Sequence, residues 1–124
     1  MRWIVDGMNV IGSRPDGWWK DRRGAMAALV DRLEHWAAAD GDDVTVVFER
    51  PPSPPINSSV IGVAHAPKAA ANSADDEIVR LVLADPRPQD IRVVTSDSAL
   101  SERVQKAGAS VYPAANFRNL VDPP

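Results

Sequence analysis

The sequence contains no cysteine and only two histidines, His35 and His65. Without thiols there is no disulfide framework, no thiolate nucleophile and no cysteine-based zinc site. No run of about 20 apolar residues is present, so we expect no membrane span. The first apolar run is interrupted by Asp6, which argues against a signal peptide. These absences make a cytoplasmic location the default expectation.

An excess of positive charge is also missing, since the formal net charge is −3. Many nucleic-acid-binding domains are basic overall, so binding of RNA or DNA would depend on local basic patches. The length of 124 residues, with 44% hydrophobic and 25% charged residues, is typical of one globular domain with one core. We therefore treat residues 1–124 as a single domain.

Apolar periodicity predicts alternating strands and helices. Strands are predicted at 2–5, 44–48, 60–66, 91–96 and 109–113; helices are predicted from about 26 to Gly41, at 74–84 with Ser73 as cap, and at 98–108 closed by Gly108. This order is typical of a mainly parallel sheet with helices on both faces, an α/β fold. The stretch 51–59 holds four prolines and no helix. The strand after it is therefore expected at an edge or with irregular pairing. Residues 114–124 show no clear pattern.

Acidic residues follow the predicted strands at their carboxyl ends. In "IVDGMNVIG" (4–12), Asp6 ends the first strand inside an otherwise apolar run. The other acids near this edge are Glu49 after the second strand, Asp97 after the strand at 91–96, and Asp75 and Asp76 at the start of a helix. Ligands of open α/β sheets bind outside the carboxyl ends of the strands. If the first strand and the strand at 91–96 are neighbours, Asp6, Asp75 and Asp97 would meet in one pocket.

Each acid taken alone has a structural explanation. Asp97 would be a good N-cap, Asp75 and Asp76 would suit the dipole of their helix, and Asp6 could form an Asx turn. Several carboxylates at one edge repel one another, however, unless a cation lies between them. Mg²⁺ and Mn²⁺ prefer such oxygen ligands.

Three segments carry a resemblance to a known family: "IVDGMNVIG", "ADDEIVRLV" and "VVTSDSAL", in this order and spacing. Together they resemble the NYN-domain ribonucleases, the YacP-like branch of the PIN-like nucleases, over nearly the whole chain. The resemblance implies a Rossmann-like PIN fold with parallel strands in the order 3-2-1-4-5, and Mg²⁺- or Mn²⁺-dependent hydrolysis of RNA. The implied site consists of the metal ligands Asp6, Asp75 and Asp97, of Asn9 as a further catalytic residue, and of Asp76, Ser96 and Glu49 in support.

The sequence departs from the family pattern at two positions near this site. Glu49 stands where relatives often have aspartate, and Ala99 stands where many PIN-like sites have another acid. Whether one or two metal ions bind therefore stays open.

Basic residues for RNA binding gather around the first loop. They are Arg14, Lys20, Arg22 and Arg23, with Lys68 on a later loop. Trp18 and Trp19 stand among them, and each could stack on a base or anchor the following helix to the core.

Two other functions compete with an RNA-cleaving enzyme. One is a catalytically silent NYN module that binds RNA or a ribonucleoprotein partner, and the other is a receiver-like or phosphatase-like domain with an acidic Mg²⁺ pocket. The latter is weaker because "DGMN" is neither an acid pair nor a phosphatase signature. RNA is the expected partner, and association with the ribosome is left open.

Overall fold

A computed structural model describes residues 1–67 and 73–123, so Lys68 lies outside the described residues. The strands form one five-stranded sheet in the order β3-β2-β1-β4-β5. Its strands are β1 (Arg2–Asp6), β2 (Asp43–Phe48), β3 (Gly62–His65), β4 (Ile91–Val94) and β5 (Ser110–Tyr112). Every pair of neighbouring strands is parallel, which confirms the predicted α/β class and the implied strand order.

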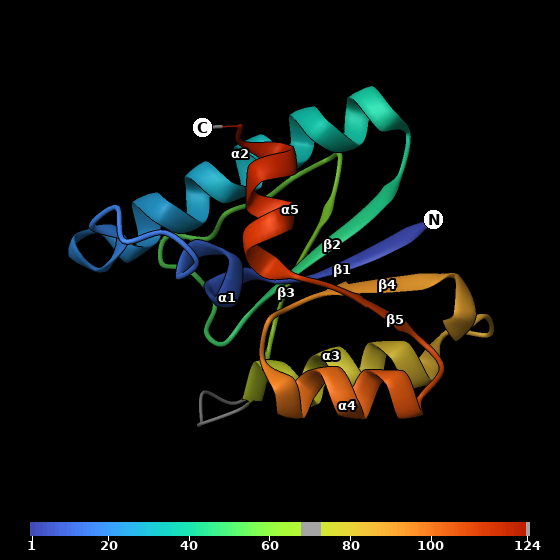
Figure 1. The fold of residues 1–124 in the computed structure, drawn as a ribbon. Helices are drawn as coiled ribbons and strands as arrows, with labels where there is room; N and C mark the ends of the chain where they lie inside the picture. The colour runs from blue at the N-terminus through green and yellow to red at the C-terminus, as the bar shows by residue number, and fades with distance from the viewer. Residues whose placement is uncertain (68–72, 124) are drawn as a thin grey trace.

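Helices cover both faces of the sheet (Figure 1). The described helices are α1 (Gly7–Ile11), α2 (Arg22–Asp40), α3 (Ser73–Ala84), α4 (Ser98–Lys106) and α5 (Ala114–Val121), with short 3₁₀ turns η1 (Trp18–Lys20) and η2 (Pro88–Asp90). Helices α1, α2 and α5 lie on one face, and α3 and α4 lie on the other. Gly41 ends α2 in the left-handed conformation, with φ of 72°, as predicted. Ser73 is the first residue of α3 rather than a residue before it. Among the described helices, none is both long and apolar enough to cross a membrane.

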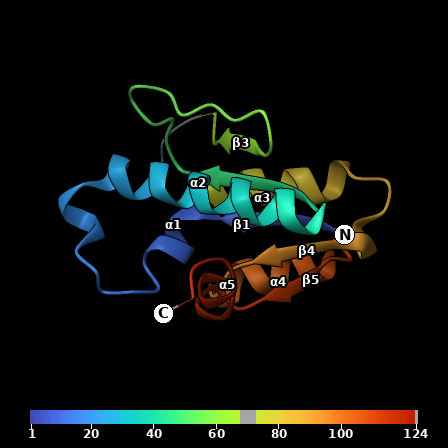
Figure 2. The ribbon, with the colours of Figure 1, turned by 90° about the horizontal axis from the view of Figure 1, so that it is seen from above.

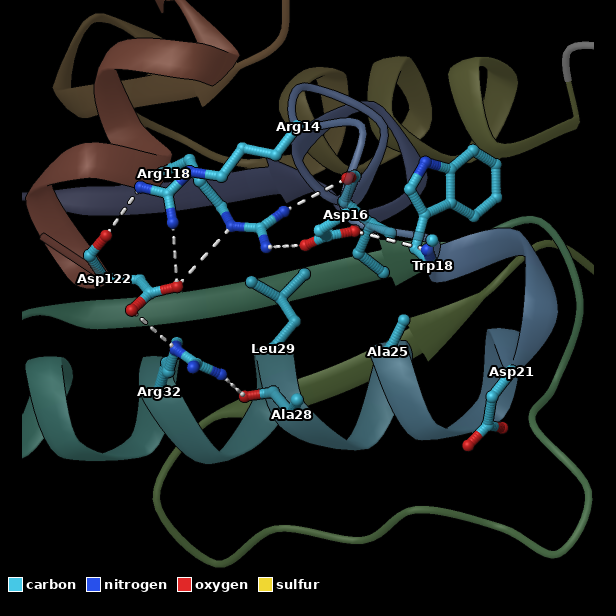
Figure 3. Close-up of a pocket in the computed structure, with 12 residues that line it drawn as sticks. Arg14, Asp16, Trp18, Asp21, Ala25, Ala28, Leu29, Arg32, Arg118 and Asp122 are labelled. Carbon is cyan, nitrogen blue, oxygen red and sulfur yellow. Dashed lines mark hydrogen bonds and ion pairs between the residues drawn. The ribbon is translucent and has the colours of Figure 1, made fainter. Parts of the chain in front are cut away.

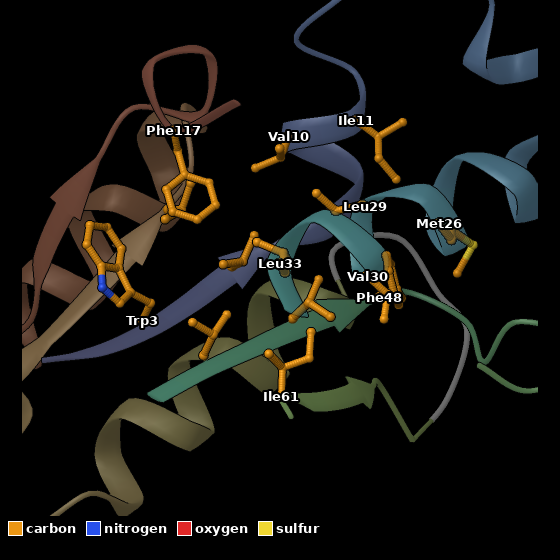
Figure 4. Close-up of a cluster of buried hydrophobic side chains, with 14 of the residues drawn as sticks. Trp3, Val10, Ile11, Met26, Leu29, Val30, Leu33, Phe48, Ile61 and Phe117 are labelled. Atoms are coloured by element: carbon orange, nitrogen blue, oxygen red, sulfur yellow. The ribbon is translucent and has the colours of Figure 1, made fainter. Parts of the chain in front are cut away.

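The alternation of side chains along β1 divides the core into two layers. Trp3 and Val5 point toward the α2 and α5 face, whereas Ile4 points toward α3 and α4. The first layer is the larger, and Figure 4 shows Trp3 at one end of it and Phe48 near the other. Phe117 of α5 packs on the Trp3 ring with 5.4 Å between ring centroids. The sheet is therefore buried from both sides, as its apolar strands require.

The third strand lies at the sheet edge, as predicted, but its pairing with β2 is regular and parallel. A loop at 49–61 makes this crossover without a helix, and Figure 2 shows it at the β3 edge of the molecule. Side-chain contacts hold the loop against α2: Arg23 donates to the Pro54 carbonyl, and the Ser58 hydroxyl donates to Glu34. The loop thus takes the place of a crossover helix.

Two helices were not predicted from the sequence. Helix α1 has only five residues and follows Asp6 directly, where we expected a continuing apolar run. A Cβ on Gly7 would lie 2.5 Å from Cε1 of the Phe48 ring, so glycine lets α1 begin against the end of β2. Helix α5 occupies the tail in which we saw no pattern, and it buries Ala114 and Phe117.

Candidate active site

A pocket of about 250 Å³ opens at the carboxyl ends of the central strands. It is lined by Asp6, Met8, Asn9, Val47, Glu49, Ala74, Asp75 and Asp97. Strand β1 lies between β2 and β4, so the acids that follow these three strands share one edge. The structure therefore brings together Asp6, Glu49, Asp75 and Asp97, whereas Asp76 and Ser96 do not line the pocket.

Asp6 is the most enclosed of these acids, with only 7% of its surface exposed. Its Oδ2 accepts a hydrogen bond of 2.9 Å from the Thr95 hydroxyl. Burial raises the pKa of Asp6 from 3.8 to about 6, the Thr95 hydrogen bond opposes this rise, and repulsion from Asp75, Asp97 and Glu49 adds to it. The folded protein therefore places a carboxylate where its charge is disfavoured.

Thr95 is a site residue that the sequence reading missed. Its side chain is 1% exposed, and its Oγ1 both donates to Asp6 and accepts a bond of 3.1 Å from the Asp97 amide. One hydroxyl thus fixes the Asp6 carboxylate relative to the backbone at Asp97. The only sequence signal was its position in "TSD", directly after an apolar strand.

Asp97 is the N-cap of α4, as its alternative explanation predicted. Its Oδ1 accepts from the Leu100 amide at 2.9 Å. The other carboxylate oxygen, Oδ2, accepts no hydrogen bond from the described residues, and Asp97 also lines the pocket. The cap therefore leaves one oxygen for a ligand, so the two roles do not compete.

Asn9 connects α1 to the end of β4. Its Oδ1 accepts from the Ser96 amide at 2.8 Å, and the Ser96 hydroxyl in turn accepts from the Ala114 amide at 2.9 Å. Ser96 therefore contacts the start of α5 rather than the pocket. The Asn9 amide nitrogen forms no hydrogen bond within residues 1–67 and 73–123, and Asn9 lines the pocket. It can donate to a ligand there.

The two adjacent acids of α3 have different surroundings. Asp75 lines the pocket, and burial followed by repulsion from Asp97 raises its pKa, although Arg103 opposes the rise. Asp76 points elsewhere: its carboxylate is 72% exposed and pairs with Arg103 at 3.0 Å. This difference follows from the rotation of about 100° between successive helical residues.

The donors around the pocket fit a hard divalent cation by their chemistry. Among the described residues, every polar side chain on the lining is a carboxylate or a carboxamide, and oxygen ligands of this kind suit Mg²⁺ or Mn²⁺. In the part of the chain that the structure describes, no group of three histidine, aspartate or glutamate side chains is arranged to hold a metal ion. The fit is therefore to an ion that takes one or two carboxylates and keeps several waters, as Mg²⁺ often does.

Residues 3–123 match the YacP-like NYN domain family. The chain belongs to this family. Two crystal structures of Rae1 (YacP) from Bacillus subtilis, one of them a tryptophan-to-leucine mutant, share the fold, each with a TM-score of 0.82. They are 24% and 22% identical in sequence to this chain, and each match covers 98% of this chain and 74% of the Rae1 chain. A search among curated proteins found no match. Family membership indicates a nuclease-type function connected with RNA.

Three arginines of this NYN domain surround a second pocket, of about 420 Å³, between the loop after α1, α2 and α5 (Figure 3). Arg14 and Arg32 both pair with Asp122, each at 3.1 Å. Arg118 pairs with Asp16 at 2.8 Å. Arg14, which we expected to bind RNA, therefore belongs to a network that fastens the first loop to α5.

The other side chains that we predicted to contact RNA differ in whether they already contact other groups of the protein. Lys20 is exposed on η1, Arg23 donates to a loop carbonyl, and Arg22 lies over the Trp18 ring, 5.2 Å from its centroid. Trp18 is half-buried against the core, whereas Trp19 is 52% exposed. Of the two alternatives for each tryptophan, Trp18 follows the second, because it anchors η1 to the core. Trp19 exposes its indole to solvent, where it could stack on a base.

Proposed function

We propose that this NYN domain is a Mg²⁺- or Mn²⁺-dependent ribonuclease that hydrolyses phosphodiester bonds at the pocket formed by Asp6, Glu49, Asp75 and Asp97. The observation that carries the proposal is the gathering of four carboxylates on one pocket. Two of them, Asp6 and Asp75, have raised pKa values because they are buried and repel their neighbours. Such a cluster destabilises the fold unless a cation offsets it.

The acids that would hold the ion in this proposal are Asp6, Asp75 and Asp97, one or two of them directly and the rest through waters that the ion keeps. A bound ion would polarise a phosphoryl oxygen and lower the pKa of a coordinated water. The protein's own contribution is to hold its oxygens in place before the substrate arrives. Thr95 fixes Asp6, and the cap on α4 fixes Asp97. Asn9 is oriented by its bond to the Ser96 amide and would donate its amide hydrogens to the phosphate or to a water.

The experiment is cleavage of end-labelled RNA oligonucleotides with Mg²⁺, with Mn²⁺ and with EDTA. We expect cleavage that EDTA abolishes and that Asp97→Asn reduces to near background, because a neutral amide binds a hard cation poorly. Asn is as good an N-cap as Asp, so this variant should remain folded. Asp90→Asn is the matched control, since Asp90 is 53% exposed and lies before β4, at the opposite end of that strand.

Two outcomes would contradict the proposal. Cleavage by Asp97→Asn at the wild-type rate would remove Asp97 from the metal site. Binding of RNA without cleavage in either ion would favour the alternative, a catalytically silent NYN module.

A further inference from the structure

A hollow of about 410 Å³ lies directly beside the acidic pocket. Its lining residues are Met8, Arg22, Met26, Phe48, Glu49 and Arg50. Met8 and Glu49 line both cavities, so the hollow and the acidic pocket are adjacent. A chain that places one phosphate among the carboxylates would therefore pass over this hollow with its next nucleotide.

The floor of the hollow is apolar. Phe48 is fully buried, Met26 is 8% exposed, and Met8 packs against the same core as a partly buried side chain. In Figure 4, Met26 and Phe48 lie at the end of the hydrophobic cluster where β2 passes beneath the first part of α2. Methionine side chains are flexible and polarizable, and they make favourable contacts with aromatic rings. This floor suits the flat face of a nucleobase.

Alongside Glu49, the rim of the hollow carries two arginines, Arg22 and Arg50. Neither forms an ion pair or a hydrogen bond within the described ranges 1–67 and 73–123, and both are exposed. The guanidinium group of Arg22 lies over the Trp18 ring. The arginines of the second pocket differ, because Arg14, Arg32 and Arg118 all pair with aspartates there (Figure 3). Of the two cavities, only this hollow therefore offers guanidinium groups that could receive a phosphate without breaking an ion pair.

We propose that this hollow is a nucleotide subsite for the RNA substrate, next to the scissile phosphate. Arg22 and Arg50 bind the phosphate of that nucleotide, and its base lies on Met8 and Met26. The volume falls within the range of about 300–1,000 Å³ that is usual for small-ligand sites. The proposal rests on the proposed ribonuclease function and specifies how its substrate is held. It also explains how an acidic site in a chain of net charge −3 can accept a polyanion.

The first test measures RNA binding in the Asp97→Asn background, which separates binding from cleavage. A single-stranded oligonucleotide is titrated at several salt concentrations with the double variant Arg22→Ala/Arg50→Ala. We expect affinity to fall by about tenfold or more, and the slope of log K against log salt to decrease by about 1.4, about 0.7 for each lost phosphate contact. The control is Arg87→Ala/Lys106→Ala, which removes the same charge from two exposed side chains away from both pockets.

The result that overturns the subsite is a loss of affinity or of salt slope that is equal in the two double variants. That outcome would leave the ribonuclease proposal intact, because wild-type cleavage in Mg²⁺ or Mn²⁺ is measured separately. Conversely, suppose that the wild-type protein cleaves no RNA while the Arg22→Ala/Arg50→Ala variant still binds RNA more weakly than the control variant. That pair of results would refute the ribonuclease proposal and support the RNA-binding subsite. Melting curves of all variants check folding. Because Arg22 and Arg50 are exposed, replacing them should leave the melting temperature unchanged.

The second test examines the base contact without changing the arginines. Oligonucleotides with one abasic position, moved along the sequence, are bound to the Asp97→Asn protein and to Asp97→Asn/Met8→Ala. We expect one abasic position, adjacent to the cleaved bond, to weaken binding severalfold in the former, because that position loses the contact of its base with Met8 and Met26. The same position should have a smaller effect when Met8 is truncated. An equal effect at every position, or no dependence on Met8, would overturn the assignment of the base.

Discussion

The substitution Asp6→Asn should stabilise the metal-free domain at neutral and alkaline pH. The pKa of Asp6 is raised from 3.8 to about 6. The folded state therefore holds its proton more tightly than the unfolded state. Well below pH 3.8 the carboxyl is protonated in both states, and its ionisation costs no stability. As the pH rises from about 4 to 6, the unfolded chain ionises first, so the free energy of unfolding falls.

The size of this effect follows from the same values. Above pH 6 the loss reaches a plateau, and a rise from 3.8 to about 6 corresponds to about 3 kcal/mol, at about 1.4 kcal/mol per pKa unit. Asparagine cannot ionise, but its carbonyl oxygen can still accept the hydrogen bond from the buried Thr95 hydroxyl. At pH 8 the variant should therefore be more stable than wild type by up to about 3 kcal/mol. The difference should shrink as the pH falls and disappear well below pH 3.8.

The assay is urea unfolding in EDTA at a series of pH values, followed by circular dichroism, with Asp90→Asn as the exposed control. A variant that is no more stable than wild type at pH 8, or a gain that does not shrink toward acid, would refute the reasoning. Adding Mn²⁺ should reverse the order, because an ion that binds only the folded wild type stabilises it by linkage. The same measurement thus gives the loss of folding free energy caused by the carboxylate cluster and the gain on binding of the cation.

Three further predictions test other parts of the structure. Gly7→Ala should destabilise the fold by about 1–3 kcal/mol in urea unfolding, because its methyl group would overlap the buried Phe48 ring; a neutral result would mean that α1 can move freely. Arg14→Ala should lower stability by about 1–2 kcal/mol through the loss of its partly buried ion pair. It should leave the salt slope of RNA binding unchanged, and a reduced slope would return Arg14 to the RNA-binding surface. Asp75→Asn should abolish metal-dependent cleavage while Asp76→Asn retains it, since only Asp75 lines the pocket; equal losses would contradict this division.

The sheet and the position of the acids could be predicted because both depend on short-range patterns. Apolar runs mark the strands, and an acid directly after a strand must lie at the strand's carboxyl end. Once β1 was found between β2 and β4, Asp6, Glu49 and Asp97 had to share an edge. The short helices were not predictable in this way. Helix α1 has five residues, too few for a helical period to show, and α5 depends on long-range packing of Phe117.

The sequence could not separate cations that bind RNA from cations that hold the fold. Arg14 and Arg22 look alike in sequence, but Arg14 meets Asp122, which is 108 residues further along the chain. Arg22 meets only an indole ring among the described residues. Local charge counts alone therefore do not show which cations around the first loop are paired within the fold and which are not. The residues that stay available are those that form no ion pair in the folded protein, and only the folded arrangement determines which these are.

The hydrogen bonds of the site explain why the carboxylate cluster can persist without disordering the edge of the sheet. Thr95 links Asp6 to the Asp97 amide, and Asn9 binds the neighbouring Ser96 amide. The end of β4 is thus held by groups from β1 and α1, and α4 begins from it with Asp97 as its cap. These contacts oppose the repulsion among the acids. They use only one oxygen of Asp97 and the carbonyl oxygen of Asn9, and both residues still line the pocket. Hydrogen bonds that orient the side chains before any ligand arrives reduce the binding energy needed to order them.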